Sequence, residues 1–159
     1  YEMEDYKQWT DGYPSIKFRN TSFSGTVSAT PFSGTDCPFF RLADAYLMYA
    51  ECVLRGGGGS ASTALDYVNA IRERAHATAI TQGELTLDFI LDERARELNL
   101  EGHRRTDLIR FGKFTGSSYI WPWKGGVQDG TSIPSTYNLF PIPQNALQAN
   151  PNLTQNPGY

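Results

Sequence analysis

The stretch that most constrains the fold is residues 85–113, LTLDFILDERARELNLEGHRRTDLIRFGK, the longest uninterrupted helical pattern in the chain. At about 100° of rotation per residue, its apolar positions share one face, as in a helix that packs against a core. Thr86 is placed to cap this helix at its N-terminus. The pattern predicts one long helix, or two collinear halves that meet at a close-packing point, Gly102. The apolar positions are Leu87, Ile90, Leu91, Ala95, Leu98, Leu108 and Ile109.

Two charged residues, Arg94 and Glu101, fall on this apolar face. A charge in such a position is costly unless it is paired and hydrogen-bonded, so we expect both to be paired inside the structure. Neighbouring charges, such as Arg94 with Glu97, have the spacing of ordinary helix pairs. The pattern therefore predicts a structural ion network, with the members Arg94, Glu97, Glu101, Arg105 and Asp107.

The same charges could be assembled into a catalytic site. Glu97 and Glu101 could serve as a carboxylate pair for glycoside hydrolysis, or the helix could present its charges to a partner protein. We favour the structural network and expect no catalytic residue. The two histidines, His76 and His103, lie outside HExxH or another ligand spacing, so no metal or cofactor is expected.

A second helical pattern precedes this stretch. FFRLADAYLMYAECVLR at 39–55 has one continuous apolar face, and Met48 and Cys52 make the opposite face partly apolar, so burial on two sides is expected. Glycines 56–59 end this helix, and Ser60 or Ser62 caps the next one. The pair predicts an αα-hairpin similar to a tetratricopeptide unit.

Three blocks of sequence carry a resemblance to a known family. ERARELNLEGHRRTDLIRFGK at 93–113 resembles the signature of the SusD/RagB family, the surface glycan-binding lipoproteins of Bacteroidetes. FFRLADAYLMYAEC at 39–52 resembles the helix that precedes it, and NLFPIPQNALQANPNLTQNPGY at 138–159 resembles the family's closing segment. We therefore expect a mainly α-helical, SusD-like C-terminal domain at 36–159. Residues 1–35 are expected to form an irregular lead-in, with a possible short strand at Ile16 and Phe18.

The resemblance also implies a function. It implies non-catalytic capture of a polysaccharide or oligosaccharide at the outer-membrane surface, beside a SusC-like TonB-dependent transporter. It further implies an N-terminal lipid anchor, absent from this chain, and a missing upstream part. Sugar-contacting aromatic residues of relatives lie mostly upstream, so the resemblance assigns no ligand residue here. A helical-repeat scaffold that contacts the transporter without a sugar site of its own is the alternative.

The irregular region after Phe114 contains the ligand-binding candidates. Gly, Pro and Ser recur there, which predicts a long loop and a Pro/Gly-rich C-terminal region instead of a helix. Exposed aromatic rings could stack on sugar rings, and a lysine could donate hydrogen bonds to hydroxyl groups. The alternative, which we weigh more heavily, is that WPW packs as a hydrophobic plug. The candidates are Tyr119, Trp121, Trp123 and Lys124.

Net charge, hydropathy and cysteine positions further limit the possible partners and structural classes of this chain. The formal net charge of −3 argues against nucleic acid as the main partner. The sequence has no run of about 18 apolar residues, as a membrane-spanning helix would need. Cys37 and Cys52 would lie too far apart along one helix for a disulfide, so two free thiols are expected.

Overall fold

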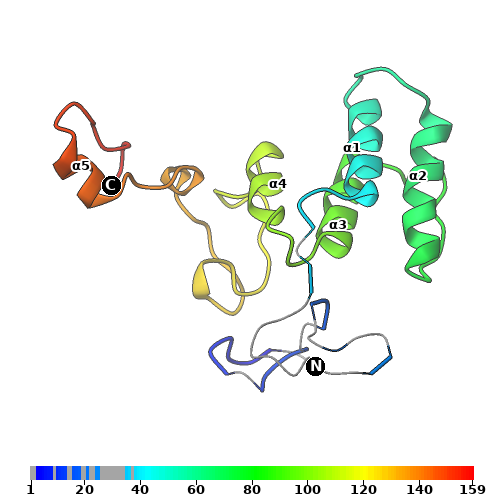
Figure 1. Ribbon diagram of the computed structural model, residues 1–159, viewed down its shortest axis with the longest axis horizontal. Helices are drawn as coiled ribbons and strands as arrows, with labels where there is room; N and C mark the ends of the chain where they lie inside the picture. The colour runs from blue at the N-terminus through cyan, green and yellow to red at the C-terminus, as the bar shows by residue number, and fades with distance from the viewer. Residues whose placement is uncertain are drawn as a thin grey trace. The chain divides into compact units, whose positions relative to one another are not determined.

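The computed structural model describes residues 3–8, 10–13, 16–18, 21, 24–25, 35–36 and 38–159. This described part is helical and contains no strand, which confirms the mainly α-helical class (Figure 1). Of the two positions of the possible strand, Phe18 lies in a turn and Ile16 has no regular structure. Most of the stretch from 19 to 34 lies outside the described residues.

The chain divides into two compact units. One comprises residues 13–104, and the other combines residues 1–12 with residues 105–159. The boundary predicted near residue 35 stays a prediction. No described helix combines the length and the apolar character that crossing a membrane requires.

Three helices build the unit of residues 13–104: α1 (Leu42–Leu54), α2 (Ala61–Arg74) and α3 (Leu87–Glu97). Polar side chains fix the starts of α2 and α3, because they accept hydrogen bonds from backbone N–H groups that have no partner inside the helix. Ser60 Oγ accepts from the Thr63 N–H at 3.3 Å, and Thr86 Oγ1 accepts from the Phe89 N–H at 3.1 Å.

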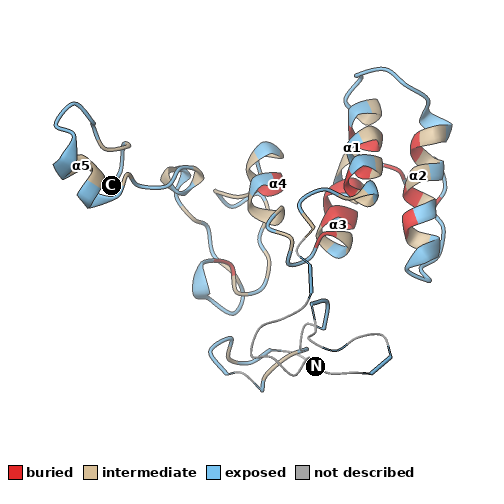
Figure 2. Ribbon diagram, in the orientation of Figure 1, coloured by how far each residue is buried: buried red, intermediate tan, exposed pale blue. Residues whose placement is uncertain are grey.

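The core of this unit lies where α1 packs against both α2 and α3. Red ribbon marks the buried positions in Figure 2. The Tyr46 and Tyr67 rings stack with their centroids 4.1 Å apart and support the α1–α2 hairpin. The predicted αα-hairpin is thus confirmed. Its buried apolar residues are Leu47, Ala50, Ala64, Val68, Ile71, Ile80, Leu85 and Ile90.

The second apolar face of α1 is not covered by the described residues. Met48 is 47% exposed, and Cys52 is exposed with a free thiol. The expectation that this face is buried is therefore wrong for the described part of the chain. Cys37 lies outside the described residues.

The long helix expected at 85–113 is interrupted. α3 ends at Glu97 and α4 (Arg104–Arg110) begins seven positions later, so a continuous helix is wrong, and the two helical parts do not meet at Gly102 as the alternative expected. Leu100 has φ 63° and Gly102 has φ 77°, and a left-handed backbone breaks the helix. Among the described residues, apart from its two chain neighbours, no atom lies within 4 Å of where a Cβ on Gly102 would stand. Gly102 therefore serves the turn and not, as expected, close packing.

The other unit holds most of α4, two short 3-10 helices, η1 (Lys124–Gly126) and η2 (Ser135–Asn138), and α5 (Gln144–Ala149). Polar side chains, more than apolar packing, hold its C-terminal tail. The side-chain amide of Gln155 accepts from the Ile142 N–H at 2.8 Å and donates to the Ile142 carbonyl at 3.0 Å. Tyr159 donates its hydroxyl hydrogen to the Leu139 carbonyl at 2.8 Å, whereas Leu153 is 40% exposed.

Candidate functional site

The loop that carries the aromatic candidates is closed and tightly folded. Its ends meet where the Gly116 N–H donates to the Ile133 carbonyl at 2.9 Å. Nearer its tip, the Thr131 N–H donates to the Lys124 carbonyl at 3.0 Å. Gly130 has φ 75°, and a Cβ there would stand 2.3 Å from the Trp121 carbonyl oxygen. The chain can close at that point only because Gly130 has no side chain.

Lys124 lies at the centre of this loop and is only 1% exposed. Its ammonium group donates to the Tyr119 carbonyl at 2.6 Å and to the Gly116 carbonyl at 3.2 Å. It also lies 4.6 Å from the centroid of the Trp121 ring, within the range of a cation–π interaction. The expectation that Lys124 offers hydrogen bonds to a ligand is therefore corrected: its ammonium group is occupied inside the loop.

The three aromatic candidates are half-buried. They are therefore neither fully buried, as a hydrophobic plug would be, nor fully exposed, as an open stacking platform would be. Tyr119 and Trp121 form one tilted pair, with ring centroids 5.8 Å apart and planes at 51°. Trp123 pairs with a residue from the start of the chain, Tyr6, at 5.2 Å and 57°. Each of these residues is partly packed and partly exposed, as a stacking surface that is held from behind would require.

The carboxylates considered for catalysis, Glu97 and Glu101, converge on Arg41 in the unit of residues 13–104. Arg41 donates from Nε to Glu101 Oε2 at 2.7 Å, and its Nη1 pairs with Glu97 Oε1. Lys17 also pairs with Glu101, and Arg74 pairs with Glu97. The Glu101 and Glu97 side chains are only 2% and 8% exposed, so two buried acids share three cations, of which Arg74 is largely exposed. We call these five residues the Arg41 cluster.

The Arg41 cluster changes the acidity of its members. Burial raises the pKa of Glu101. Hydrogen bonds from Arg41 and Lys17 lower it by a larger amount, so the pKa lies below the ordinary value. The hydrogen bond to Glu101 in turn raises the pKa of Arg41, against the opposing effect of burial. A general acid of a glycosidase needs a raised pKa so that it holds a proton to donate. Glu101 has the opposite property.

The remaining members of the predicted ion network have other partners. Arg94 Nη1 donates to Asp44 Oδ1 of α1 at 2.7 Å. Asp107 pairs with Arg110 at 2.9 Å, within α4. Arg105 donates to the Tyr137 carbonyl at 2.7 Å. Of the five predicted residues, only Glu97 and Glu101 share a partner in the Arg41 cluster.

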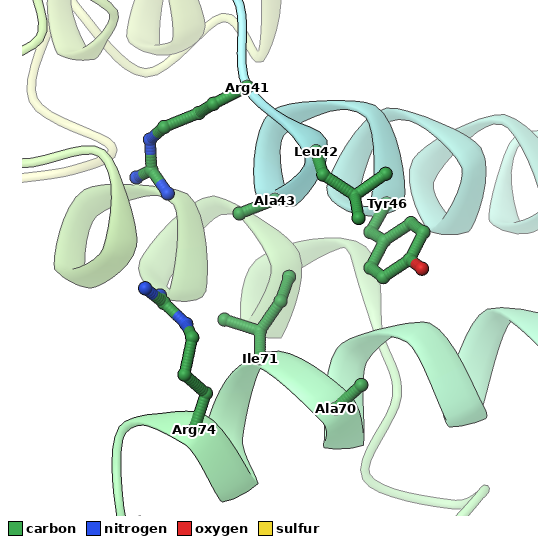
Figure 3. A pocket seen from close by; sticks show the side chains of 7 residues that line it. All are labelled: Arg41, Leu42, Ala43, Tyr46, Ala70, Ile71 and Arg74. Carbon is green, nitrogen blue, oxygen red and sulfur yellow. The ribbon is translucent and has the colours of Figure 1, made fainter. Parts of the chain in front are cut away.

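A pocket of about 320 Å³ lies beside the Arg41 cluster, between α1 and α2 (Figure 3). Its walls are mostly apolar, and the two guanidinium groups at one end point towards each other in Figure 3. Arg41 and Arg74 are both paired with Glu97, so each guanidinium group already has an acidic partner. Within the described part of the chain, no group of three His, Cys, Asp or Glu side chains could hold a metal ion. The pocket is lined by Arg41, Leu42, Ala43, Tyr46, Ala70, Ile71 and Arg74.

Comparison with known families gives a match over almost the whole sequence. The family model described as "SusD family" matches residues 2–159. The chain belongs to the SusD family. The family resemblance stated from three sequence blocks is thereby confirmed, and it extends to the lead-in before residue 36.

Relatives within the SusD family include proteins named for glycan binding. The chain is 45% identical over 152 residues to the starch-binding protein SusD of Bacteroides thetaiotaomicron, which covers 95% of this chain and 27% of the relative. Among solved structures it is similar to surface glycan-binding protein A from Bacteroides uniformis, with a TM-score of 0.61 and 31% identity over 76% of this chain and 27% of that one. A laminarin-binding SusD-like protein gives a TM-score of 0.56 and 35% identity over 76% of this chain and 23% of that one. The chain spans about a quarter of the length of these SusD-family proteins.

Two contacts of this SusD-family chain were not found from its sequence. Arg41 and Tyr6 each meet a partner from a distant part of the chain, Glu101 and Trp123 respectively. Helical spacing identifies neighbours at three or four positions only, so it could not indicate either contact. The one available signal for Tyr6 was the run of aromatic residues near the start of the chain.

Proposed function

We propose that this chain belongs to a protein that captures glycans without catalysis at the bacterial cell surface. The observation that carries the proposal is its 45% identity, over 95% of the chain, to a protein named for starch binding. The similarity to a laminarin-binding SusD-like protein supports the same class of ligand. Both names refer to glucans, so glucan chains are the first ligands to test.

The Arg41 cluster supports a binding role over hydrolysis. Hydrolysis of a glycosidic bond requires two carboxyl groups that flank the bond, one of them able to give up a proton. Glu97 and Glu101 are instead held by Arg41, and the lowered pKa of Glu101 keeps it ionised at neutral pH. Their role in this proposal is to fix α3 to the segment before α1.

The proposed ligand surface is the loop around Lys124. Tyr119, Trp121 and Trp123 offer partly open rings, and the apolar face of a sugar ring can lie against such rings. Gln128 and Asp129 are exposed on the same loop and could bond to sugar hydroxyl groups. Lys124 would hold the loop in shape from within, through the Tyr119 and Gly116 carbonyls.

The family context adds a place and a partner to the proposal. We propose an outer-membrane surface lipoprotein that delivers glycan to a SusC-like TonB-dependent transporter. Affinity capture of the transporter from outer-membrane extracts by the anchored protein would test this part.

Calorimetric titration with starch, laminarin and other soluble polysaccharides tests the ligand. The decisive variant is the double substitution Trp121→Ala with Trp123→Ala, checked for folding by circular dichroism. A matched control is Phe39→Ala with Phe40→Ala, since both rings are at least 84% exposed and lie outside the loop. Binding that is lost only in the tryptophan variant supports the loop site. Absence of binding by the unmodified chain favours the scaffold alternative, and release of reducing ends that depends on Glu97 or Glu101 would support a hydrolase.

A further inference from the structure

We infer that Tyr6 forms a second sugar-binding position beside Trp123, so that the loop site takes oligosaccharide chains in preference to single sugars. The inference rests on the proposed glycan-binding function. It adds a residue from the opposite end of the sequence and names the length of chain as the property that is recognised.

The first observation is the contact between the two rings. Tyr6 and Trp123 have centroids 5.2 Å apart, and their planes differ by 57°. Tyr6 is 51% exposed, so about half of its surface remains available after this contact. The Tyr6 hydroxyl oxygen is also the nearest atom to a Cβ placed on Gly126, at 3.7 Å. Tyr6 therefore borders the loop at Trp123 and at Gly126.

The second observation is that the backbone around Tyr6 is held in a defined turn. Asp11 Oδ2 accepts hydrogen bonds from the Glu4 and Asp5 N–H groups at 2.7 and 2.6 Å. The Gln8 N–H donates to the Asp5 carbonyl at 2.9 Å and closes the turn over Tyr6. A ring presented from a hydrogen-bonded turn loses less conformational freedom when a ligand binds, which favours affinity.

The third observation is the tilt between the rings. The apolar face of a pyranose is roughly flat and packs fully against one aromatic plane at a time. Planes that differ by 57° cannot both lie flat on the same sugar face, so Tyr6 and Trp123 would contact different units of a chain. The same reasoning applies to Tyr119 and Trp121: their planes differ by 51°, so these two rings would also contact different sugar units. Lys7 is exposed with its ammonium group 5.7 Å from the Tyr6 ring centroid, and it is placed to bond to hydroxyl groups of the outer unit.

The test measures how affinity depends on chain length. Maltooligosaccharides and laminarin oligosaccharides, from the disaccharide to the heptasaccharide, are titrated into the unmodified chain and into Tyr6→Ala, Tyr6→Phe and Tyr13→Ala. Tyr6→Phe keeps the ring and removes the hydroxyl group. Tyr13→Ala removes a tyrosine that is 79% exposed and lies outside the loop, and it serves as the matched control. Circular dichroism and thermal unfolding establish that each variant is folded.

In the expected result, Tyr6→Ala weakens binding of the longest oligosaccharide about tenfold and changes disaccharide binding by less than about twofold. Tyr6→Phe and Tyr13→Ala keep the affinity of the unmodified chain at every length. An equal loss at all lengths would mean that Tyr6 only supports the loop, and no loss at any length would mean that it contacts no sugar; either result overturns the inference and leaves the proposed function intact. If the unmodified chain binds no oligosaccharide of any length, the proposed function fails and this inference fails with it.

Discussion

Arg94 Nη1 lies 2.7 Å from Asp44 Oδ1, and this ion pair joins α3 to α1 inside the core of the helical unit. The Arg94 side chain is 4% exposed and that of Asp44 is 12% exposed. Water can therefore do little to solvate either charge if its partner is removed. The Asp44 carboxylate therefore depends on Arg94 to remain charged in the interior.

Arg94→Ala should lower the free energy of unfolding by about 3–5 kcal/mol, because it leaves the Asp44 carboxylate buried without this partner. Urea denaturation followed by circular dichroism measures the change. Arg74→Ala is the matched control: its side chain is 62% exposed, and its pair with Glu97 should contribute about 0–1 kcal/mol. A loss for Arg94→Ala as small as that of the control would contradict a buried role for the pair.

Glu101→Gln should make the stability of the protein less sensitive to acid. The folded state holds the pKa of Glu101 below its ordinary value of 4.5, because hydrogen bonds from Arg41 and Lys17 outweigh the effect of burial. Ionised Glu101 thus stabilises the fold above that ordinary value, and this contribution is lost as the pH falls through the lower folded pKa.

Thermal unfolding of both proteins between about pH 6 and about pH 3 measures this effect. Near neutral pH the variant should be less stable by about 1–3 kcal/mol, and the difference should shrink in acid. Glu73→Gln, at an exposed position of α2, is the control and should follow the unmodified protein. A constant difference in stability between Glu101→Gln and the unmodified protein across this pH range is the contrary result. It would refute a link between stability and the ionisation of Glu101.

Leu100→Gly should stabilise the protein slightly, although it removes a large side chain. Leu100 has φ 63° and is 59% exposed, so it bears the cost of a left-handed backbone with little burial in return. Relief of that cost, about 1–2 kcal/mol, exceeds the entropy that glycine adds to the unfolded chain, about 0.4–1 kcal/mol. Chemical denaturation should detect the gain. Gly102→Ala, at φ 77° in the same turn, should be destabilising, and equal signs for the two variants would contradict this explanation.

Lys124→Met should disturb the aromatic loop while the helical unit stays folded. Methionine keeps a similar length but offers no donor to the Tyr119 and Gly116 carbonyls, at a cost of about 1–3 kcal/mol for the two unsatisfied acceptors. The nearby Trp121 ring makes intrinsic fluorescence a direct reporter. Far-ultraviolet circular dichroism should keep its helical signal. Unchanged fluorescence and stability would show that the ammonium group does not hold the loop.

Gly130→Ala should be more damaging than Gly116→Ala, although the two glycines share a φ of 75°. Both alanines would bear the cost of a left-handed backbone. Only the Cβ at Gly130 would meet backbone, 2.3 Å from the Trp121 carbonyl oxygen, whereas the space around Gly116 is open. The difference between the two melting temperatures measures the cost of the steric clash between the added Cβ and the Trp121 carbonyl oxygen. Equal losses would show that the loop closes without needing that contact.

The hairpin and the helix starts could be predicted from sequence because they depend on local information. The apolar period that includes Leu47 and Val68 and the cap at Thr86 each involve neighbours within a few positions. The break after Glu97 was missed because the apolar positions on its two sides are in phase, although the backbone between them is not helical. Phase alone does not show that a helix is continuous.

The parts of the candidate site that sequence could not indicate depend on contacts between distant residues. Arg41 reaches Glu101 across 60 positions, and the choice of partner is made by the packing of α1 against α3. Lys124 looked like a free donor because its sequence does not show the carbonyls that surround it. The aromatic residues of the loop could be named from the sequence, but their tilt and their partial burial required the fold.

The hydrogen-bonding of the C-terminal tail affects how the chain behaves towards other copies of itself. Gln155 occupies both the N–H and the carbonyl of Ile142 with one side-chain amide, as a neighbouring strand would do with its backbone. An extended segment with unpaired backbone groups is a template for strand addition and aggregation. The glutamine thus occupies the two backbone groups of Ile142 that an incoming strand would use, and Asn156 occupies the Phe140 carbonyl in the same way, so the tail opposes strand addition along this segment.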